Sequence, residues 1–537
     1  MSEEFNEEYD YDKAAEERRI RRKKRRRRAL ISRIVFFVVL LLIAATAILL
    51  VVDVTLKKNG RSLGSLLNGS SHTGSITETA RPQPDTETDL SQMTTESETP
   101  DSDANAPVTG ETGQPSTAQS ESPADAQAKL DEARLMAQGY DYDGAIALLQ
   151  NIPGHESIPE VTTAIADIEK SKAACVAVDV TTVPHIFYHS LINNTDAAFN
   201  VSVLGQGQVD GMNAWMTTIE EFDKITQKMY DNGYVFVRLH DLVTQTTDAD
   251  GTVHFSPNTN LLLPPDKKAV VLSVDDLSYY HSYEPASYPD KLVLDENGKV
   301  KCHYVKPDGT EEIGDFDVVP RLNTFLEQHP DGAYKGARGT IALTGYNGVF
   351  GYRTDEDYET RQSLMEDQQK WLEQHPDFDR AAEIAEATKI AEALKAEGWD
   401  FASHTWGHLS VTNKTVDELR IDNEKWVNNV QNIVGPTDTI IFAHGNDIGS
   451  WEGYSDDNEK YAYFKGAGYN FFCNVDGSTP YWVQITDRYV RQGRIDLDGY
   501  MLYQSSQGAT TVIDNMFKAS EVFDQRRPTP VVANGES

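Results

Sequence analysis

Between about residues 183 and 503, short apolar runs alternate with amphipathic stretches, and this pattern restricts the possible folds more than any other feature. Residues 269–274 form a continuous apolar run, which is typical of a strand buried on both faces. Residues 383–397 have helical periodicity that Gly398 ends, and residues 399–403 form the next strand. Repeated strand–helix units predict a parallel sheet or barrel, whose functional groups collect at the C-terminal ends of its strands.

Side chains that bind metals follow several of these predicted strands. Asp275 and Asp276 end one strand, His404 follows another with His408 four residues later, and His444 follows a third. Two imidazoles and one carboxylate with an open fourth position are what a catalytic zinc-type site needs, and the second carboxylate can take a proton from water. Taken singly, such acids are often turn caps and such histidines are often surface or core residues. Their shared position at strand ends favours a metal site.

The N-terminal region combines a basic run with an apolar run. Residues 18–28 are all basic except Ile20, and residues 34–52 contain no charge. Nineteen such residues can cross a membrane, and the basic side is expected to stay inside. We therefore predict a cytoplasmic tail (1–33) and one transmembrane helix (34–53). A cleaved signal peptide and a nucleic-acid-binding run are the alternatives. The net charge of −35 argues against nucleic acid as a partner.

Four further segments complete the predicted organisation. Residues 54–123 are rich in Ser and Thr with few large apolar side chains, which predicts a disordered linker. Residues 124–175 predict a helical hairpin resembling one tetratricopeptide unit. Because one unit lacks neighbours to form a solenoid, a spacer packed on the next domain is favoured over a peptide-binding array. Residues 180–520 form the α/β domain, and residues 521–537 are expected to be a flexible tail.

Three sequence motifs resemble those of the polysaccharide deacetylases (NodB-homology domain, carbohydrate esterase family 4). They are Ser-Val-Asp-Asp at 273–276, His-Thr-Trp-Gly-His at 404–408 and the entry strand Ile-Phe-Tyr-His at 186–189. The resemblance covers about residues 181–516 and suggests a divergent member. It implies a distorted (β/α) barrel with fewer than eight regular repeats.

The resemblance also implies roles for individual residues. Asp276, His404 and His408 would hold a divalent metal, Zn in the first place with Co or Ni as alternatives. Asp275 would be the general base that takes a proton from the attacking water. The reaction implied is the metal-assisted hydrolysis of an N-acetyl group, which releases acetate and leaves a glucosamine-type unit.

The second half of the family pattern is missing. The usual Arg-x-Pro motif has no counterpart in residues 442–447, and no histidine follows His444, although the family takes its general acid from a C-terminal Leu-x-His. Three accounts stay open: His444 is a relocated acid, Asp275 is both base and acid, or the domain binds metal and sugar with little turnover. Arg491 and Arg494 either replace the missing arginine, which orients the base in the family, or pair with the acidic surface.

Aromatic and basic residues near the predicted strand ends are candidate substrate-binding residues. We select Tyr346, Trp406, Trp482, Arg491 and Arg494, because sugar faces stack on aromatic rings and arginines bind polar groups. Core packing is the competing explanation for each aromatic residue.

Together these features predict a membrane-anchored N-deacetylase whose partners are an N-acetylated cell-wall or exopolysaccharide glycan and the membrane, and not nucleic acid. Its C-terminal domain would lie outside the plasma membrane of a Gram-positive-type bacterium. The alternative is a glycan-binding or scaffold protein with a degenerate, weakly active domain. The sequence indicates no oligomeric state.

Overall fold

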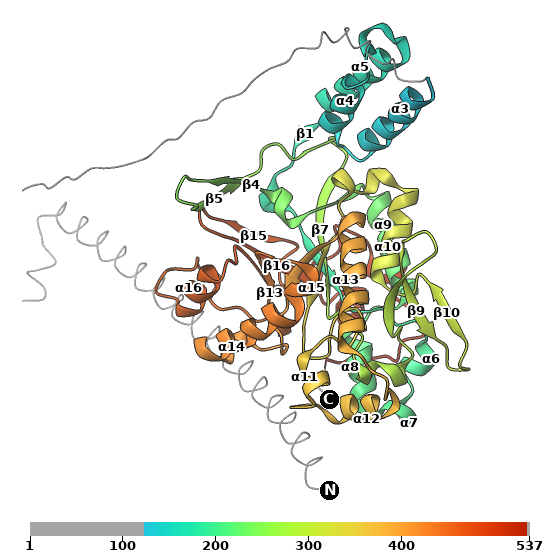
Figure 1. Cartoon of the computed structure of the whole chain (residues 1–537), viewed down its shortest axis with the longest axis vertical. Coiled ribbons are helices and arrows are strands. Elements are labelled where there is room, and N and C mark those ends of the chain that lie inside the picture. The colour runs from blue at the N-terminus through green and yellow to red at the C-terminus, as the bar shows by residue number, and fades with distance from the viewer. Residues whose placement is uncertain (1–122, 534–537) are drawn as a thin grey trace, which may run out of the picture. The chain divides into compact units, whose positions relative to one another are not determined.

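The computed structural model of the chain describes residues 123–533 (Figure 1). The predicted cytoplasmic tail, the membrane span at 34–53 and nearly all of the predicted linker lie outside the described residues. Among residues 123–533, no helix combines the length and the apolar character needed to cross a membrane.

Seven parallel strands form a closed ring, because the first and last strands of the series also pair with each other. This arrangement confirms an α/β barrel with fewer than eight repeats. In ring order the strands are β11 (Thr340–Leu343), β12 (Asp400–Ser403), β13 (Thr439–Ile441), β14 (Phe471–Val475), β16 (Val490–Asp496), β2 (His185–Tyr188) and β7 (Lys268–Asp275).

Two more strands extend the sheet beyond the ring. β3 (Tyr234–Val237) lies parallel to β7, and β15 (Trp482–Ile485) lies antiparallel to β16. The other strands form small sheets: β1 (Val176–Ala177) with β6 (Leu262–Leu263), β4 (Val243–Thr247) with β5 (Val253–Pro257), and β8 (Lys291–Leu294) with β9 (Val300–Val305) and β10 (Glu311–Gly314).

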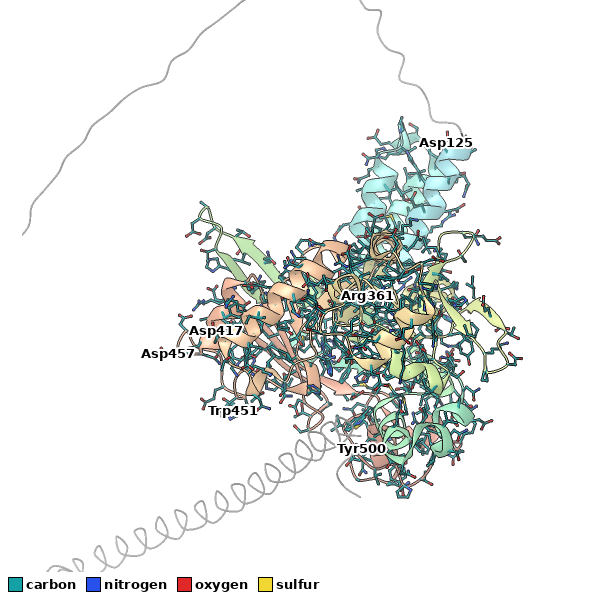
Figure 2. The ribbon with its side chains drawn as sticks, turned by 60° about the horizontal axis from the view of Figure 1, so that its bottom comes forward. Asp125, Arg361, Asp417, Trp451, Asp457 and Tyr500 are labelled. Carbon is teal, nitrogen blue, oxygen red and sulfur yellow. The ribbon has the colours of Figure 1, made fainter. Side chains whose placement is uncertain are left out.

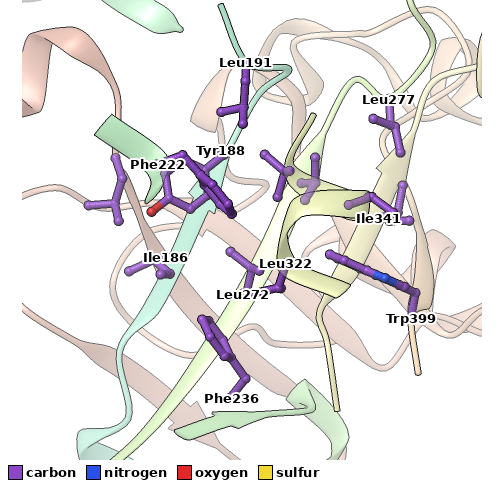
Figure 3. Close-up of a cluster of buried hydrophobic side chains, with 14 of the residues drawn as sticks. Ile186, Tyr188, Leu191, Phe222, Phe236, Leu272, Leu277, Leu322, Ile341 and Trp399 are labelled. Atoms are coloured by element: carbon purple, nitrogen blue, oxygen red, sulfur yellow. The ribbon is translucent and has the colours of Figure 1, made fainter. Parts of the chain in front are cut away.

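Helices surround the barrel and bury its outer surface (Figure 1). The largest apolar cluster joins strand residues such as Leu272 and Ile341 to helix residues such as Phe222 and Leu322 (Figure 3). The helices of this layer are α8 (Gln206–Trp215), α9 (Ile219–Asp231), α10 (Val318–Gln328), α12 (Glu366–Gln374), α13 (Arg380–Glu397), α14 (Val416–Trp426), α16 (Glu459–Gly466) and α17 (Gly499–Ser506). The short helices are α6 (Thr195–Ala198), α7 (Val201–Leu204), α11 (Glu356–Thr360), α15 (Asn432–Val434) and α18 (Ala519–Val522).

The expected helical segment before the barrel consists of α3 (Pro123–Gln138), α4 (Tyr142–Gln150) and α5 (Pro159–Ala173). Tyr140, between α3 and α4, stacks on Tyr334 with 6.4 Å between ring centroids and donates a hydrogen bond to the Asp331 carbonyl. Residues 331–334 precede β11, so these helices contact the N-terminal end of the barrel, away from the strand ends that carry the predicted site.

The segment after residue 520 is packed, which corrects the expectation of a flexible tail for residues 521–533. The Arg527 guanidinium is fully buried and pairs with the Glu221 carboxylate, with contacts of 2.6 and 2.7 Å. Arg527 also donates hydrogen bonds to the carbonyls of Asn213 and Met216. A buried partner on α9 offsets the cost of desolvating the guanidinium.

We predict that Arg527→Ala lowers the free energy of unfolding by about 3–5 kcal/mol, because it leaves the Glu221 charge buried without its partner. Chemical denaturation of the full-length protein measures this change. The matched control is Arg488→Ala, since Arg488 and its partner Asp456 are 52% and 71% exposed and their ion pair should contribute little. Equal effects of the two substitutions would contradict a stabilising role for the buried pair.

Candidate functional site

Polar side chains fill the inside of the barrel in layers. In the lower layer His185 of β2 contacts Gln492 of β16 through Nδ1 and Ser273 of β7 through Nε2, at 3.0 Å each. Burial lowers the pKa of His185 to about 3, with a smaller contribution from the Arg494 charge, so the imidazole is neutral at neutral pH. Side chains two residues further along each strand point to the same inner face.

The next layer holds a buried bidentate ion pair. Arg494 of β16 donates to both carboxylate oxygens of Asp275, at 2.8 and 2.9 Å, and its guanidinium lies 4.0 Å over the Phe187 ring. Burial alone would raise the pKa of Asp275, but the charges of Arg494 and His404 outweigh it and lower that pKa. Asp275 is therefore held ionised and in a fixed orientation.

Asp276 lies one residue further on, at the mouth of the barrel. Its Oδ1 accepts a hydrogen bond of 2.7 Å from the Tyr280 hydroxyl. Burial would raise its pKa, but the charges of His408, His404 and His189 lower it well below the usual range. Asp276 is thus an ionised carboxylate that faces three imidazoles.

Two histidines complete the cluster. The His404 Nδ1 lies 2.7 Å from the carbonyl oxygen of Ile441. Because a carbonyl only accepts, Nδ1 carries the hydrogen, and Nε2 is the nitrogen placed to act as a metal ligand. The Nε2 of His408 lies 3.5 Å from Asp276 Oδ2, and burial lowers the pKa of His408 to about 4 despite that carboxylate. The His408 imidazole is therefore suited to bind a metal rather than a proton.

These three residues fit a metal centre. One ligand atom from each of Asp276, His404 and His408 lies within 4.8 Å of the others. Zn bonds of roughly 2.0–2.2 Å to nitrogen and oxygen need such a convergent set, and two imidazoles with one carboxylate are a known catalytic combination. The His408 side chain is 28% exposed, whereas those of Asp276 and His404 are 8% and 2% exposed, so the cluster opens toward solvent on the His408 side. The geometry supports a divalent metal and does not select among Zn, Co and Ni.

Backbone strain is concentrated at the same place. Asp276, Thr405, His408 and His444 all have φ between 50° and 63°, in the left-handed region that non-glycine residues rarely adopt. Such conformations persist where the surrounding structure enforces them and often mark functional sites. Two of the strained residues, Asp276 and His408, belong to the metal-type cluster itself.

Two other histidines lie near the cluster. The exposed His444 ring stands 4.2 Å from the His408 ring, and its Nε2 lies 3.0 Å from the His408 carbonyl oxygen. His189 directly follows β2, and its Nδ1 lies 3.1 Å from the Trp215 carbonyl oxygen, which leaves Nε2 as the second functional nitrogen. A strand-end histidine was the signal used for His404 and His444, and the same signal identifies His189, which the sequence analysis did not select.

The predicted aromatic wall is partly present. Tyr346 stacks on Tyr280, with 5.3 Å between centroids, and Tyr280 bonds to Asp276. The Trp406 ring packs edge-to-face on Tyr346, and its Nε1 donates to Asp355 while Lys425 lies 3.7 Å over it. Tyr346 therefore lies beside the metal-type cluster, and Trp406 supports it from behind.

The structure corrects the predicted substrate contacts of Arg491 and Arg494. Their side chains are 2% and 1% exposed. Arg491 pairs with Asp447 at 2.7 Å and lies under Trp482, with 4.9 Å to the ring centroid. Thus Arg491 anchors the loop after β13, which carries the 78% exposed Trp451 at the edge of the domain (Figure 2). Arg494 instead orients Asp275. This is the role of the missing arginine, for which both arginines were candidates.

Comparisons with known proteins return distant likenesses only. No family model matches the chain, and no curated protein matches it either. A deacetylase from Streptococcus pyogenes, solved in complex with acetate, aligns over 60% of this chain and 96% of its own, with 14% identity and a TM-score of 0.28. A protein described as a polysaccharide deacetylase, from Bacillus anthracis, aligns over 64% and 69%, with 13% identity and a TM-score of 0.30. Function must therefore be argued from the geometry of the site.

We predict that the full-length protein binds Zn²⁺ through this cluster, so that added Zn²⁺ raises its Tm and EDTA reverses the rise. His404→Ala should weaken Zn²⁺ binding by at least about a hundredfold in isothermal titration calorimetry, because a ligand is lost. The control is His254→Ala, whose imidazole pairs with Asp248 and Asp487 on the β4–β5 side. Zn²⁺ affinity that survives His404→Ala would contradict the assignment.

Proposed function

We propose that the chain is a metal-dependent hydrolase that removes N-acetyl groups from a cell-wall or exopolysaccharide glycan. The observation that carries the proposal is the pairing of two units at one barrel mouth. One is the convergent set of Asp276, His404 and His408, and the other is Asp275, which Arg494 holds ionised. The first unit fits a Lewis acid and the second fits a general base.

A metal in this cluster would polarise the acetyl carbonyl and make an attacking water more acidic. Asp275 takes the proton of that water. Its Oδ2 lies 3.8 Å from the His404 Nε2, so the base stands directly beside the ligand set. Arg494 donates one hydrogen bond to each oxygen of Asp275. Each oxygen therefore keeps a second lone pair that can accept a hydrogen bond from the attacking water. The strained loops at Asp276 and His408 keep these groups in place.

The surroundings of the cluster favour a sugar substrate. Tyr346 and Tyr280 form a stacked aromatic wall next to Asp276, and Tyr346 is partly exposed. An amphipathic aromatic wall suits the apolar face of a pyranose ring. We further propose that residues 34–53 anchor the chain and that the barrel acts outside the plasma membrane, which rests on the basic run at 18–28 and the uncharged run after it.

One observation favours a second candidate, a glycan-binding protein with little turnover. No histidine follows His444 in the sequence, and the Nε2 of His444 is directed to the His408 carbonyl rather than across the mouth. In that case glycan binding should survive His404→Ala, whereas the hydrolase proposal predicts that acetate release is lost with the metal site.

We expect the full-length protein, supplied with Zn²⁺, to release acetate from N-acetylglucosamine oligomers. Asp275→Asn should lower kcat by about 10²–10⁴-fold, since the base is removed while the shape is kept. An enzymatic acetate assay measures this loss. Asp487→Asn is the matched control, because Asp487 lies in the turn between β15 and β16, at the N-terminal end of β16, where it pairs with His254. The hydrolase proposal fails if Asp275→Asn releases acetate as fast as the parent protein.

His444 receives a separate test, because its predicted role as general acid depends on its orientation. We expect His444→Ala to lower kcat by less than about tenfold, since its Nε2 bonds to the His408 carbonyl. Steady-state kinetics at neutral pH measure the effect. A loss of about 10²–10⁴-fold with unchanged Zn²⁺ affinity would restore His444 as the acid.

A further inference from the structure

A second pair of carboxylates lies at the mouth of the barrel, on β16 and the residues after it. Asp496 is the last residue of β16, as Asp275 is the last residue of β7. Because Gln492 and Arg494 both point into the barrel, the strand alternation places Asp496 on the same inner face, one layer above Arg494. Its register partner on β2 is Phe187, two residues before His189.

The environment of Asp496 requires a proton. Its Oδ1 is buried and has no hydrogen-bond donor, although the residue as a whole is partly exposed. Asp498 lies two residues further on, and its carboxyl group raises the pKa of Asp496 both by its charge and by a side-chain hydrogen bond that forms only when one of the two groups is protonated. Asp498 also accepts 2.6 Å from the Met501 amide as the N-cap of α17, which favours its charged form. Asp496 is thus the better holder of the proton.

The charges around the pair act in the same direction. Burial, then the carboxylates of Asp498 and Asp275, raise the pKa of Asp496 well above its usual range, and Arg494 only partly opposes them. Burial also raises the pKa of Asp498, against the Met501 amide and the charge of Arg527, while Glu221 raises it further. On β2, the Asp496 charge raises the pKa of Tyr188, after burial and the Glu221 charge. Two adjacent carboxyl groups that share one proton are an established way to keep an acid at neutral pH.

We propose that Asp496 is the catalytic acid that protonates the leaving nitrogen, with Asp498 as the positioning residue that keeps it protonated. This inference rests on the proposed function. When the tetrahedral intermediate collapses, the C–N bond breaks and its electron pair stays on nitrogen. The Asp496 O–H bond breaks, an N–H bond forms, and two facing carboxylates remain. Their repulsion drives uptake of one proton from solvent, while Asp275 releases to solvent the proton that it took from water.

The assignment explains why no histidine is needed after His444. The base Asp275 and the acid Asp496 occupy the ends of β7 and β16, which both pair with β2. Arg494 separates their roles, because it pairs with Asp275 and only weakly offsets the burial of Asp496. One barrel mouth therefore contains a carboxylate held charged and a carboxyl group held neutral, which is the pairing that general acid–base catalysis requires.

The test compares kcat across pH 6 to 10 for the full-length parent protein, Asp496→Asn, Asp498→Asn and His189→Ala, with Zn²⁺ and an N-acetylglucosamine oligomer. We expect kcat of the parent to fall as pH rises through the ionisation of the pair, because the acid must be protonated. Asp496→Asn should lose about 10²–10⁴-fold in kcat at neutral pH with little change in KM, and its remaining activity should lack that alkaline fall. Asp498→Asn should move the alkaline fall in kcat to lower pH, since the negative charge that raises the pKa of Asp496 is removed.

The expected results and the contrary ones are separable. An alkaline fall that persists in Asp496→Asn and disappears in His189→Ala would overturn the inference and make His189 the acid. Equal kcat in the parent and Asp496→Asn would overturn it as well. The failure of the proposed function is different, because the parent itself would then release no acetate. In that event the role of Asp496 as an acid is rejected as well. Zn²⁺ binding is measured separately in Asp496→Asn, and unchanged binding shows that this variant is folded.

Discussion

The buried ion pair between Asp275 and Arg494 is the interaction on which the rest of the site depends. The pair joins β7 to β16 across the inside of the barrel, and its two residues are 219 positions apart in the chain. A buried charge pair stabilises a fold only when both partners are well bonded, and breaking it leaves an isolated charge. Here each oxygen of Asp275 accepts from Arg494, and Ser273 accepts from the same guanidinium. The pair fixes the position of the base Asp275, and the next residue, Asp276, lies at the mouth of the barrel.

Local residue spacing was enough to predict part of this site. The pairing of side chains that are far apart in the sequence could not be predicted. The four-residue separation of His404 and His408 and the strand-end position of Asp275 and Asp276 are visible in the sequence, and the structure brings three of those residues within 4.8 Å. The partner of Asp275 could not be identified, because it depends on which strands close the ring. Arg494 was therefore only one of two candidates for the missing arginine, as well as a candidate substrate contact, and the sheet register directs it inward to Asp275.

Burial explains the other differences between prediction and structure. The segment around Arg527 has the composition of an exposed tail, yet a single carboxylate on α9 provides its buried partner. Likewise Asp496 is an ordinary acid in the sequence, and its pKa is raised by burial and by the carboxylates of Asp498 and Asp275. The helix and strand pattern was predictable because it reflects local periodicity. The protonation of Asp496 depends also on burial and on Asp275, which the fold brings close and the sequence does not.

The central claim is that Asp276, His404 and His408 together hold a catalytic metal beside Asp275. A crystal of the full-length protein soaked in Zn²⁺, with anomalous diffraction measured at the zinc edge, tests it most directly. The account predicts one strong peak at roughly 2.0–2.2 Å from the two Nε2 atoms and one Asp276 oxygen, with Asp275 still paired to Arg494 and not a ligand. A peak at another place in the barrel, or Asp275 bound to the zinc in place of Arg494, would contradict it.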